Sequence, residues 1–331
     1  MTMVIGTEAA ESAGSVLPLD AADAAAVEQV ARRLCAVEPE ALDDPAWVAA
    51  ARAGWDELPV GLRRAVRRFR RDPGSTGMLL LRNLPVDAEA LPPTPTVPGS
   101  VQRTPTVPAA VLLMLACGLG DPAAFLAEKS GALVQDVVPV PGKEDFQGNA
   151  GSVLLMFHNE NAFHEHRPDF VMLLCLRSDH DRVAGLRTVC IREALPLLAD
   201  DTRDALFSPE FATKPPPSFG LASDGTPPHA VLTGDPDDPD LRVDFAATVG
   251  LTERASKALA ELEQLFGKVA HTVCPLPGDL AIVDNRVTAH GRTAFRPRYD
   301  GVDRWLQRTF VLCDLRRSRP HRPDDGYVLA N

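Results

Sequence analysis

The sequence predicts an α+β protein with a mainly β core, arranged as a double sheet or jelly roll with helices packed around it. Two observations lead to this class. Apolar residues recur at helical spacing through residues 1–75, whereas the rest of the chain holds many short apolar runs separated by turn residues. One more helical pattern, ERASKALAELEQLFGKVAHTV, interrupts these runs. We therefore expect N-terminal and inserted helices outside the sheets.

The N-terminal part, residues 1–75, is predicted to be mainly helical. Asp20 is a good N-cap residue, and the segment AADAAAVEQVARRLCAV after it has helical periodicity. The segment PAWVAAARAGWDELPVGLRRAVRRFRRD continues the same pattern. The period changes at GSTGMLLLRNLPV, a glycine-bounded apolar run of strand length, so the helical part ends before it.

A proline-rich segment, residues 91–108, precedes most of the strands and holds two copies of TPTVP. Its composition would suit a linker between domains. The apolar helical run AAVLLMLACGLG follows it, however, and must pack on something. We therefore expect an ordered, extended surface loop and one domain spanning residues 1–331. The strand-like runs beyond it are ALVQDVVPV, SVLLMF, FVMLLCLRS, LRTVCI, HAVLTG, LRVDF, DLAIVD and RWLQRTFVLCDL.

Charge and composition narrow the class of partner. A net charge of -11 and a pI near 5.2 argue against a nucleic acid or an anionic membrane, because both are bound through Lys and Arg. No apolar stretch is long enough to span a bilayer, and the N-terminus is acidic, unlike a signal peptide. We expect a cytoplasmic protein that binds a small molecule, with no protein partner evident. The six scattered cysteines indicate free, buried thiols.

The stretch MFHNENAF places His158 and Glu160 two residues apart, directly after a strand-like run. Alternate residues of a strand share a face, so both side chains can reach one ion while Asn159 points away. The spacing alone is weak, because the composition gives about one such pair by chance. A facial iron site also needs a second histidine, and His290 follows a later strand and turn. Two further histidines of the first stretch are expected to be surface or neighbouring groups: His164 and His166.

Two blocks of the sequence resemble the clavaminate synthase-like branch of the Fe(II)- and 2-oxoglutarate-dependent oxygenases. The first is HNENAFHEHRPDFVMLLCLRSDHDR, and the second combines VDN, AHGR and FRPRYDGVDRWLQR. The resemblance spans roughly residues 78–316, including LPPTPT and QDVVP. The branch includes asparagine oxygenase and the arginine and lysine hydroxylases of antibiotic pathways, and its use of Glu as a ligand is characteristic. The resemblance implies a double-stranded β-helix (jelly roll).

The resemblance also implies a metal site and a cosubstrate site. The catalytic centre would be Fe(II) bound by His158, Glu160 and His290. Arg304, fourteen residues after the second histidine, would bind the distal carboxylate of 2-oxoglutarate through two charge-assisted hydrogen bonds. Family members often place a threonine beside 2-oxoglutarate at the position that is Leu186 here. We expect Thr188, two residues later on the same strand face, to take its place.

Candidate substrate-binding residues follow from the resemblance and from the local sequence. Arg308 matches an arginine that contacts the substrate carboxylate in amino-acid hydroxylases of the branch. Gln135 in VQDVVP and Asn149 in FQGNAGS are candidates for the amino-acid head group. The acidic run TGDPDDPDLRVD fits a solvated turn. Alternatively, it supplies aspartates that hold a cationic substrate, as in related arginine hydroxylases, and Asp235 and Asp237 are then the first choices.

The expected function is Fe(II)- and 2-oxoglutarate-dependent hydroxylation of a free L-amino acid at its β or γ carbon, which consumes O2 and releases succinate and CO2. The side chain is expected to be basic or an amide, as in arginine, lysine, citrulline, asparagine or a cyclic arginine derivative. Oxidative cyclisation or desaturation with the same cofactors is an alternative. A non-catalytic jelly-roll binding protein is another. A zinc hydrolase with the same three ligands would leave the placement of Arg304 and Arg308 unexplained.

Overall fold

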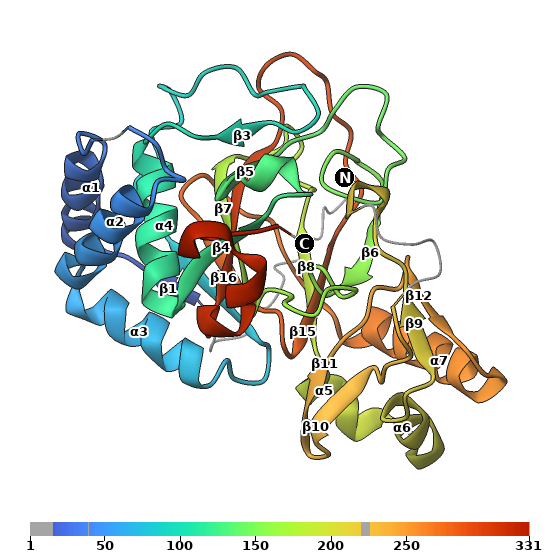
Figure 1. Ribbon diagram of the computed structural model, residues 1–331. Coiled ribbons are helices and arrows are strands. Elements are labelled where there is room, and N and C mark those ends of the chain that lie inside the picture. The colour runs from blue at the N-terminus through green and yellow to red at the C-terminus, as the bar shows by residue number, and fades with distance from the viewer. Residues whose placement is uncertain (1–15, 39, 220–225, 331) are drawn as a thin grey trace.

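Residues 16–38, 40–219 and 226–330 are described by the computed structural model, in which helices lie at both ends of a stack of sheets (Figure 1). One helical layer consists of α1 (Ala21–Leu34), α2 (Pro45–Glu57), α3 (Val60–Arg71) and α4 (Val107–Leu119). The other consists of α5 (Ile191–Ala194), α6 (Asp200–Leu206) and α7 (Glu253–Val269). Short 3-10 turns are η1 (Lys129–Gly131), η2 (Leu195–Leu197), η3 (Pro217–Phe219), η4 (Leu315–His321) and η5 (Pro323–Asp325).

Local sequence explains how the first helical layer forms. Asp20 accepts a hydrogen bond from the backbone N–H of Asp23 at 2.8 Å and caps α1, as predicted. Asp44 caps α2 by the same kind of bond. Helix α4 is buried from Ala109 to Leu119 and lies against α1, α2, α3 and β16. The apolar run after the proline-rich loop therefore packs in the core, as expected.

The larger sheet has the strand order β1-β2-β14-β7-β16-β4-β17, and β5 also pairs with β16 and carries β3. Strand β16 pairs with β7 on one side, and on the other its first half pairs with β5 and its second half with β4. The register sets Arg308 of β16 opposite Gln135 of β5. The strands are β1 (Val16–Pro18), β2 (Met78–Arg82), β3 (Val101–Gln102), β4 (Asp121–Phe125), β5 (Val134–Val137), β7 (Phe170–Arg177), β14 (Leu280–Asp284), β16 (Trp305–Leu312) and β17 (Val328–Leu329).

The smaller sheet is antiparallel throughout and has the order β13-β8-β15-β6. Its strands are β13 (His271–Val273), β8 (Leu186–Cys190), β15 (Thr288–Arg292) and β6 (Leu155–His158). The register aligns Thr188, His290 and His158 in one row across three strands. Opposed residues of antiparallel strands share a face, so these three side chains point to the same side of the sheet. Two antiparallel strand pairs complete the fold: the hairpin of β10 (Leu232–Asp235) and β11 (Asp238–Leu241), and β9 (Phe211–Thr213) with β12 (Thr248–Gly250).

Three apolar clusters fill the spaces between the layers. Successive residues of a strand point to opposite faces, so Leu79 of β2 packs against α1 to α4 while Leu80 faces the smaller sheet. The cluster around Leu80 also contains Leu186 of β8, so it lies between the two sheets. On the outer side of the smaller sheet, Val189 shares a cluster with Phe266 of α7. Each sheet is thus covered on one face by helices and on the other by its neighbour.

The structure departs from the sequence prediction in two places. Val16–Pro18 forms a strand parallel to β2 within the part predicted to be mainly helical. In the acidic run, strand β11 covers Asp238–Leu241 and ends where the predicted strand LRVDF begins. The Asp-Pro-rich segment closes a tight hairpin there because both residues favour turns. Residues 1–15 and 39, which the helical prediction included, lie outside the described residues.

The cysteine prediction is confirmed in part. All six cysteines are free and Cys117, Cys175 and Cys190 are buried, but Cys35 and Cys313 are half-buried and Cys274 is exposed, so burial was wrongly predicted for Cys274. Within the described part of the chain, none of the helices is both long and apolar enough to cross a bilayer.

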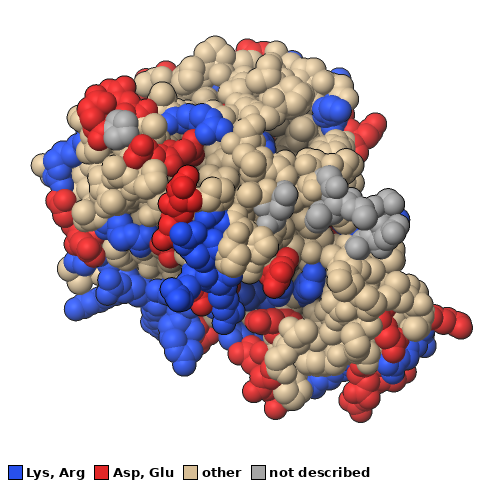
Figure 2. Space-filling model, viewed as in Figure 1, with Lys and Arg blue, Asp and Glu red and all other residues tan. Residues whose placement is uncertain are grey.

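Charge is unevenly spread over the surface, since six arginines of α3 contribute to a basic area near that helix (Figure 2). The net negative charge therefore does not describe every face of the molecule.

Gly77 links the two sheets at a point where a side chain does not fit. It has a φ of 63°, and a Cβ there would lie 1.7 Å from Oγ1 of Thr288, the first residue of β15. We expect Gly77→Ala to lower the free energy of unfolding by about 1–3 kcal/mol, because the backbone is strained and the strand must move. Urea unfolding measures this change through its midpoint.

Gly61→Ala is the matched control, because a Cβ at that position of α3 meets nothing within 4 Å. It should change stability by no more than about 1 kcal/mol, in the stabilising direction. Equal midpoints for the two variants would show that the contact between Gly77 and Thr288 contributes nothing.

Candidate active site

Two histidines and a glutamate converge at the inner face of the smaller sheet. His158 ends β6 and lies opposite His290 of β15, with ring centroids 4.4 Å apart. Glu160 Oε2 lies 3.7 Å from His290 Nε2. One ligand atom from each of the three residues lies within 4.8 Å of the others. The structure therefore brings together the three residues that the sequence singled out.

Both imidazoles are suited to bind a metal. His158 Nδ1 lies 3.0 Å from the carbonyl oxygen of Met156, which orients the ring and leaves Nε2 free. Burial lowers the pKa of His290 well below its usual value, and the nearby His158 and Arg308 lower it further. His290 is therefore neutral, which is the form of imidazole that coordinates metals.

Asn159 points away from this cluster and, with Asn285, joins the two segments that carry its residues. Asn159 Nδ2 donates to the carbonyl oxygens of Asn285 at 2.8 Å and Thr288 at 3.1 Å. Asn285 Oδ1 accepts from the backbone N–H of Glu160 at 2.7 Å, and its Nδ2 donates to the Glu160 carbonyl at 3.1 Å. These bonds fix the segment around Glu160 relative to the turn before β15.

Arg304 is a buried cation that lacks a counter-ion among the described residues. It is 5% exposed, and its guanidinium forms no hydrogen bond or ion pair within residues 16–38, 40–219 and 226–330. Its Cζ lies 5.8 Å from the Phe295 ring centre, and Arg292 lies over the same ring at 5.3 Å. Burial lowers the pKa of Arg304, and burial followed by the Arg304 charge lowers the pKa of Arg292 to about 9. Two buried cations this close favour a bound carboxylate.

The proline-rich loop holds the turn that precedes Arg304. Thr94 of this loop is buried, its Oγ1 donates to the Asp303 carbonyl at 2.8 Å, and its N–H donates to the Gly301 carbonyl at 2.8 Å. Arg177, at the end of β7, donates to Thr94 Oγ1 at 2.6 Å and to the Gly301 carbonyl at 3.1 Å. The loop is therefore hydrogen-bonded to the turn that leads into Arg304.

Arg308 lies within β16, four residues after Arg304, and is surrounded by polar side chains. It donates to Glu160 Oε2 at 3.0 Å and also to Glu128 and Gln135. In the amide orientation that pairs donors with acceptors, the Asn149 oxygen accepts from Nη1 at 3.1 Å and Nη2 at 3.0 Å. Burial alone would lower the pKa of Arg308, but the Glu128 and Glu160 carboxylates raise it overall. The structure thus joins Arg308 to the two predicted head-group residues.

Thr188 lies directly opposite His290 across β8 and β15, and it is buried. Leu186 lies opposite Arg292 in the same register and belongs to the apolar cluster between the sheets. The Thr188 hydroxyl therefore lies beside His290, whereas the apolar Leu186 side chain lies beside Arg292. This arrangement supports the expected use of Thr188 in place of Leu186.

The structure corrects the expectation for Asp235 and Asp237. Both are exposed in the β10–β11 hairpin, where Asp237 pairs with Arg203 at 3.3 Å and Asp235 accepts from the Asp237 N–H at 2.9 Å. They form a solvated turn, because the hairpin directs them outward. Asp244, the last aspartate of the same run, instead forms a β-bridge with His158.

Three residues of the site escaped the sequence analysis: Glu128, Arg292 and Asp244. Arg292 lies two residues after His290 on one strand, so the alternation rule would have found it. Glu128 lies just before η1, and no spacing connects it to any ligand. Asp244 belongs to the acidic run. Only the fold shows that Asp244, rather than the aspartates of the turn, lies opposite His158.

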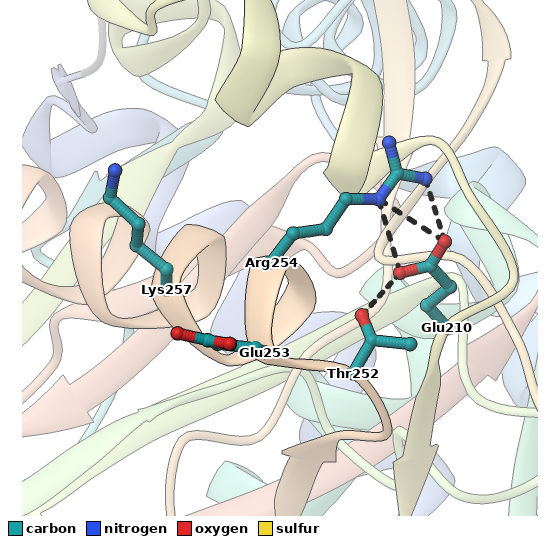
Figure 3. A pocket seen from close by; sticks show the side chains of 5 residues that line it. All are labelled: Glu210, Thr252, Glu253, Arg254 and Lys257. Atoms are coloured by element: carbon teal, nitrogen blue, oxygen red, sulfur yellow. Dashed lines mark hydrogen bonds and ion pairs between the residues drawn. The ribbon is translucent and has the colours of Figure 1, made fainter.

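A surface hollow of about 540 Å³ lies on α7, and none of the residues that line it belongs to the cluster (Figure 3). Arg254 donates to Glu210 there at 2.6 Å, so the opposite charges satisfy each other. The lining residues are Glu210, Thr252, Glu253, Arg254 and Lys257. This hollow therefore has none of the features of the site described above.

The donor set fits a defined group of ligands. Two imidazoles and one carboxylate on one side of a metal suit Fe(II), which keeps its other positions open. Arg304, lacking a counter-ion, suits the far carboxylate of a dicarboxylic acid. Arg308 together with Glu128 suits the carboxylate and ammonium groups of an amino acid.

Comparison with known proteins agrees with this chemistry. A family model described as "Taurine catabolism dioxygenase TauD, TfdA family" matches residues 221–310, which include His290, Arg304 and Arg308. The chain is 65% identical to L-asparagine oxygenase of Streptomyces coelicolor, with 94% of each chain covered. It is 37% identical to clavaminate synthase 2 of Streptomyces clavuligerus, with 78% of this chain and 80% of that protein covered.

Two solved structures are similar over nearly the whole chain. One is asparagine oxygenase in complex with Fe(II), 2S,3S-3-hydroxyasparagine and succinate, which is 64% identical, has a TM-score of 0.93, and covers 96% of this chain and 99% of its own. The other is the non-heme iron oxygenase OrfP in complex with Fe and alpha-ketoglutaric acid. It is 30% identical, with a TM-score of 0.86, and the match covers 95% of this chain and 99% of that one.

Fold and site together define a non-haem iron oxygenase. The protein is a dioxygenase that uses Fe(II) and 2-oxoglutarate. The chain belongs to the clavaminate synthase-like family of Fe(II)- and 2-oxoglutarate-dependent oxygenases, as the two sequence blocks indicated.

Thr94→Val tests whether the proline-rich loop positions Arg304. We expect the 2-oxoglutarate concentration for half-maximal activity to rise about three- to tenfold, because a buried hydrogen bond of about 1 kcal/mol is lost beside Arg304. Succinate formation at varied 2-oxoglutarate measures this, and kcat should stay near that of the wild type. Thr94→Ser is the matched control and should behave as the wild type. An unchanged requirement in Thr94→Val would contradict the positioning role.

Proposed function

We propose that this protein hydroxylates free L-asparagine at the β carbon. The observation that carries the proposal is that two buried arginines with different surroundings flank the cluster of His158, Glu160 and His290. Arg304 has no counter-ion among the described residues, whereas Arg308 contacts Glu128, Gln135, Asn149 and Glu160. Arg304 directly precedes β16 and Arg308 lies within it, so the two side chains leave the backbone four residues apart. Two molecules that each carry a carboxylate, a dicarboxylic acid and an amino acid, therefore have separate anchors beside one metal site.

The metal and cosubstrate roles are assigned from this arrangement. His158, Glu160 and His290 would hold Fe(II), and Arg304 would grip the distal carboxylate of 2-oxoglutarate, with Thr188 beside it. When bound here, Fe(II) and 2-oxoglutarate supply the oxidising chemistry that consumes O2, releases succinate and CO2, and inserts one oxygen atom into a substrate C–H bond.

The amino-acid head group has a complementary set of partners. Arg308 would bind the substrate carboxylate, and the Asn149 and Gln135 side chains would complete the contacts of the head group. Glu128 contacts Arg308 and would accept from the substrate ammonium. Holding both charged ends of the substrate fixes which carbon lies nearest the metal, and this decides where oxygen enters.

Asparagine is favoured over a basic amino acid for two reasons. Asp235 and Asp237, which would have served a cationic side chain, face solvent. Asp244 forms a β-bridge with His158, and its carboxylate can accept a hydrogen bond from an amide NH2 group. An amide side chain is neutral, so its binding avoids the cost of burying a positively charged side chain. The 64% identical relative bound to 2S,3S-3-hydroxyasparagine supports both the amide side chain and the β carbon.

We also infer a single oxygenase domain over residues 1–331, whose two facing sheets form a double-stranded β-helix. Within the part predicted to be mainly helical, residues 1–75, helices α1, α2 and α3 contribute to the outer layer that covers the larger sheet. The proline-rich loop, residues 91–108, belongs to the same domain because Thr94 bonds to the turn before Arg304. A cytoplasmic location stays a prediction.

The central test is an assay of the Fe(II)-loaded protein with 2-oxoglutarate, O2 and L-asparagine. We expect succinate and a product heavier by one oxygen atom by mass spectrometry, with D-asparagine as the matched control. His290→Ala should abolish succinate formation, because one of three metal ligands is lost. Arginine, lysine and citrulline should release far less succinate.

Other outcomes of this assay separate the alternatives. A product lacking two hydrogens would indicate desaturation or cyclisation. Anaerobic addition of Fe(II) and 2-oxoglutarate should produce a weak visible charge-transfer band, which neither a zinc hydrolase nor a protein without the cosubstrate site would show. If succinate were released at the same rate with and without each amino acid, the proposal would be overturned.

Asp244→Ala tests the assignment of the substrate amide. We expect it to weaken asparagine binding by about 1.5–3 kcal/mol, roughly ten- to 150-fold in the half-saturating concentration, because a hydrogen bond to a charged group is lost. Asp237→Ala is the control, since Asp237 lies in the exposed hairpin and should leave the kinetics unchanged. Equal effects of the two variants would remove Asp244 from the site.

A further inference from the structure

A second group of metal-binding side chains lies outside the site described above. Glu165, His166 and His321 each offer one ligand atom, and these atoms lie within 4.8 Å of one another. The imidazole rings of His166 and His321 have centroids 5.0 Å apart and are tilted by 57°. The first two residues follow the segment that carries His158 and Glu160, whereas His321 ends η4 near the C-terminus. Two distant parts of the chain therefore meet at this cluster.

The rings of His166 and His321 lack the partners that other histidines have. Among the described residues, no side chain or carbonyl is hydrogen-bonded to their ring nitrogens. By contrast, His229 Nε2 lies 2.9 Å from Thr213 Oγ1, and His271 Nε2 lies 2.8 Å from Glu193. Both rings are half-buried, so their nitrogens are free to bind something else.

The chemistry of the three residues suits a divalent transition metal. His166 and His321 offer imidazole nitrogens, and Glu165 supplies a carboxylate oxygen and negative charge. Two imidazoles and a carboxylate are common ligands of Zn(II). In a tetrahedral site with bonds of about 2.0–2.1 Å the ligand atoms are about 3.4 Å apart. The ligand atoms here lie within 4.8 Å of one another, so small side-chain rotations bring them to that separation. Glu165 is exposed and can rotate to close this distance.

A third cluster of similar composition does not have this property. His180 lies between two aspartates, with Nε2 at 3.0 Å from Asp300 and Nδ1 at 3.7 Å from Asp303. Both ring nitrogens therefore already face carboxylate oxygens. This group is explained by the contacts between the His180 ring and the two carboxylates.

We propose that Glu165, His166 and His321 form a second metal site, which takes Zn(II) or a similar divalent transition-metal ion. The bound ion would fasten the C-terminal turn η4 to the loop that follows the proposed iron ligands. The His166 N–H donates to His164 Nδ1 at 2.9 Å, and the His164 ring packs edge-on against Phe125 of β4 with centroids 4.8 Å apart. An ion held by His166 therefore restrains a loop that is anchored in the core between the sheets.

The test counts Zn(II) bound by the metal-free, full-length protein. Wild-type protein should bind two Zn(II) ions per chain, one at the proposed iron site and one at the new site. His321→Ala should bind one, and Glu165→Gln should weaken the second site about tenfold or more. His271→Ala is the matched control, because its ring pairs with Glu193 outside the cluster, and it should still bind two.

The outcomes distinguish this site from the iron site. His290→Ala should lose one ion, and His290→Ala with His321→Ala should lose both, whether or not asparagine is the substrate. A second ion that survives both His321→Ala and Glu165→Gln, which is an adventitious ion only, would overturn the proposal. So would a wild-type chain that binds a single ion. Thermal unfolding of the metal-free variants checks folding, and Glu165→Gln changes an exposed side chain that should leave it intact.

Discussion

The register of the smaller sheet is the constraint on which the site depends. Strand β15 places His290 opposite Thr188 on one side and opposite His158 on the other. A shift of one residue in this pairing would turn every side chain of the strand to the opposite face, and the cluster would be lost. Asn159 and Asn285 oppose such a shift, because their side chains form hydrogen bonds with the backbone on both sides of the site. The ligand geometry is thus a consequence of backbone pairing.

Buried charge is the second organising feature. Arg292, Arg304 and Arg308 are all nearly excluded from solvent, and burial without partners is unfavourable for each of them. The protein resolves this differently at the two ends of the site. Around Arg308 it supplies two glutamates and two amides, whereas around Arg304 it supplies an aromatic ring and, among the described residues, no carboxylate within ion-pair distance. The difference in surroundings is what distinguishes an anchor for a dicarboxylate from an anchor for a zwitterion.

Much of this could be read from local sequence. The helical period of the first part, the apolar run of α4 and the strand-length runs of β7, β14 and β16 were predicted from periodicity, which depends on neighbouring residues only. His158, Glu160, His290, Arg304 and Arg308 were found through motifs, and the fold brings the first three together. The acidic run shows where such reasoning fails. Composition pointed to Asp235 and Asp237, but the hairpin turns them to solvent and brings Asp244 to His158 instead.

The sequence by itself determined which residues alternate along each strand and which of them carry metal-binding or carboxylate-binding groups, because these properties are local. Only the tertiary structure decided which strands are neighbours. Glu128 meets Arg308 across 180 residues, and Thr94 meets Asp303 across 209 residues. Glu128 follows β4, which pairs with β16, and Thr94 lies in the loop beside the turn that precedes β16. Both contacts therefore depend on which segments surround β16, and no spacing along the chain encodes them. The physical reason is that hydrogen bonds between strands fix positions in space, whereas periodicity fixes only the direction in which each side chain points.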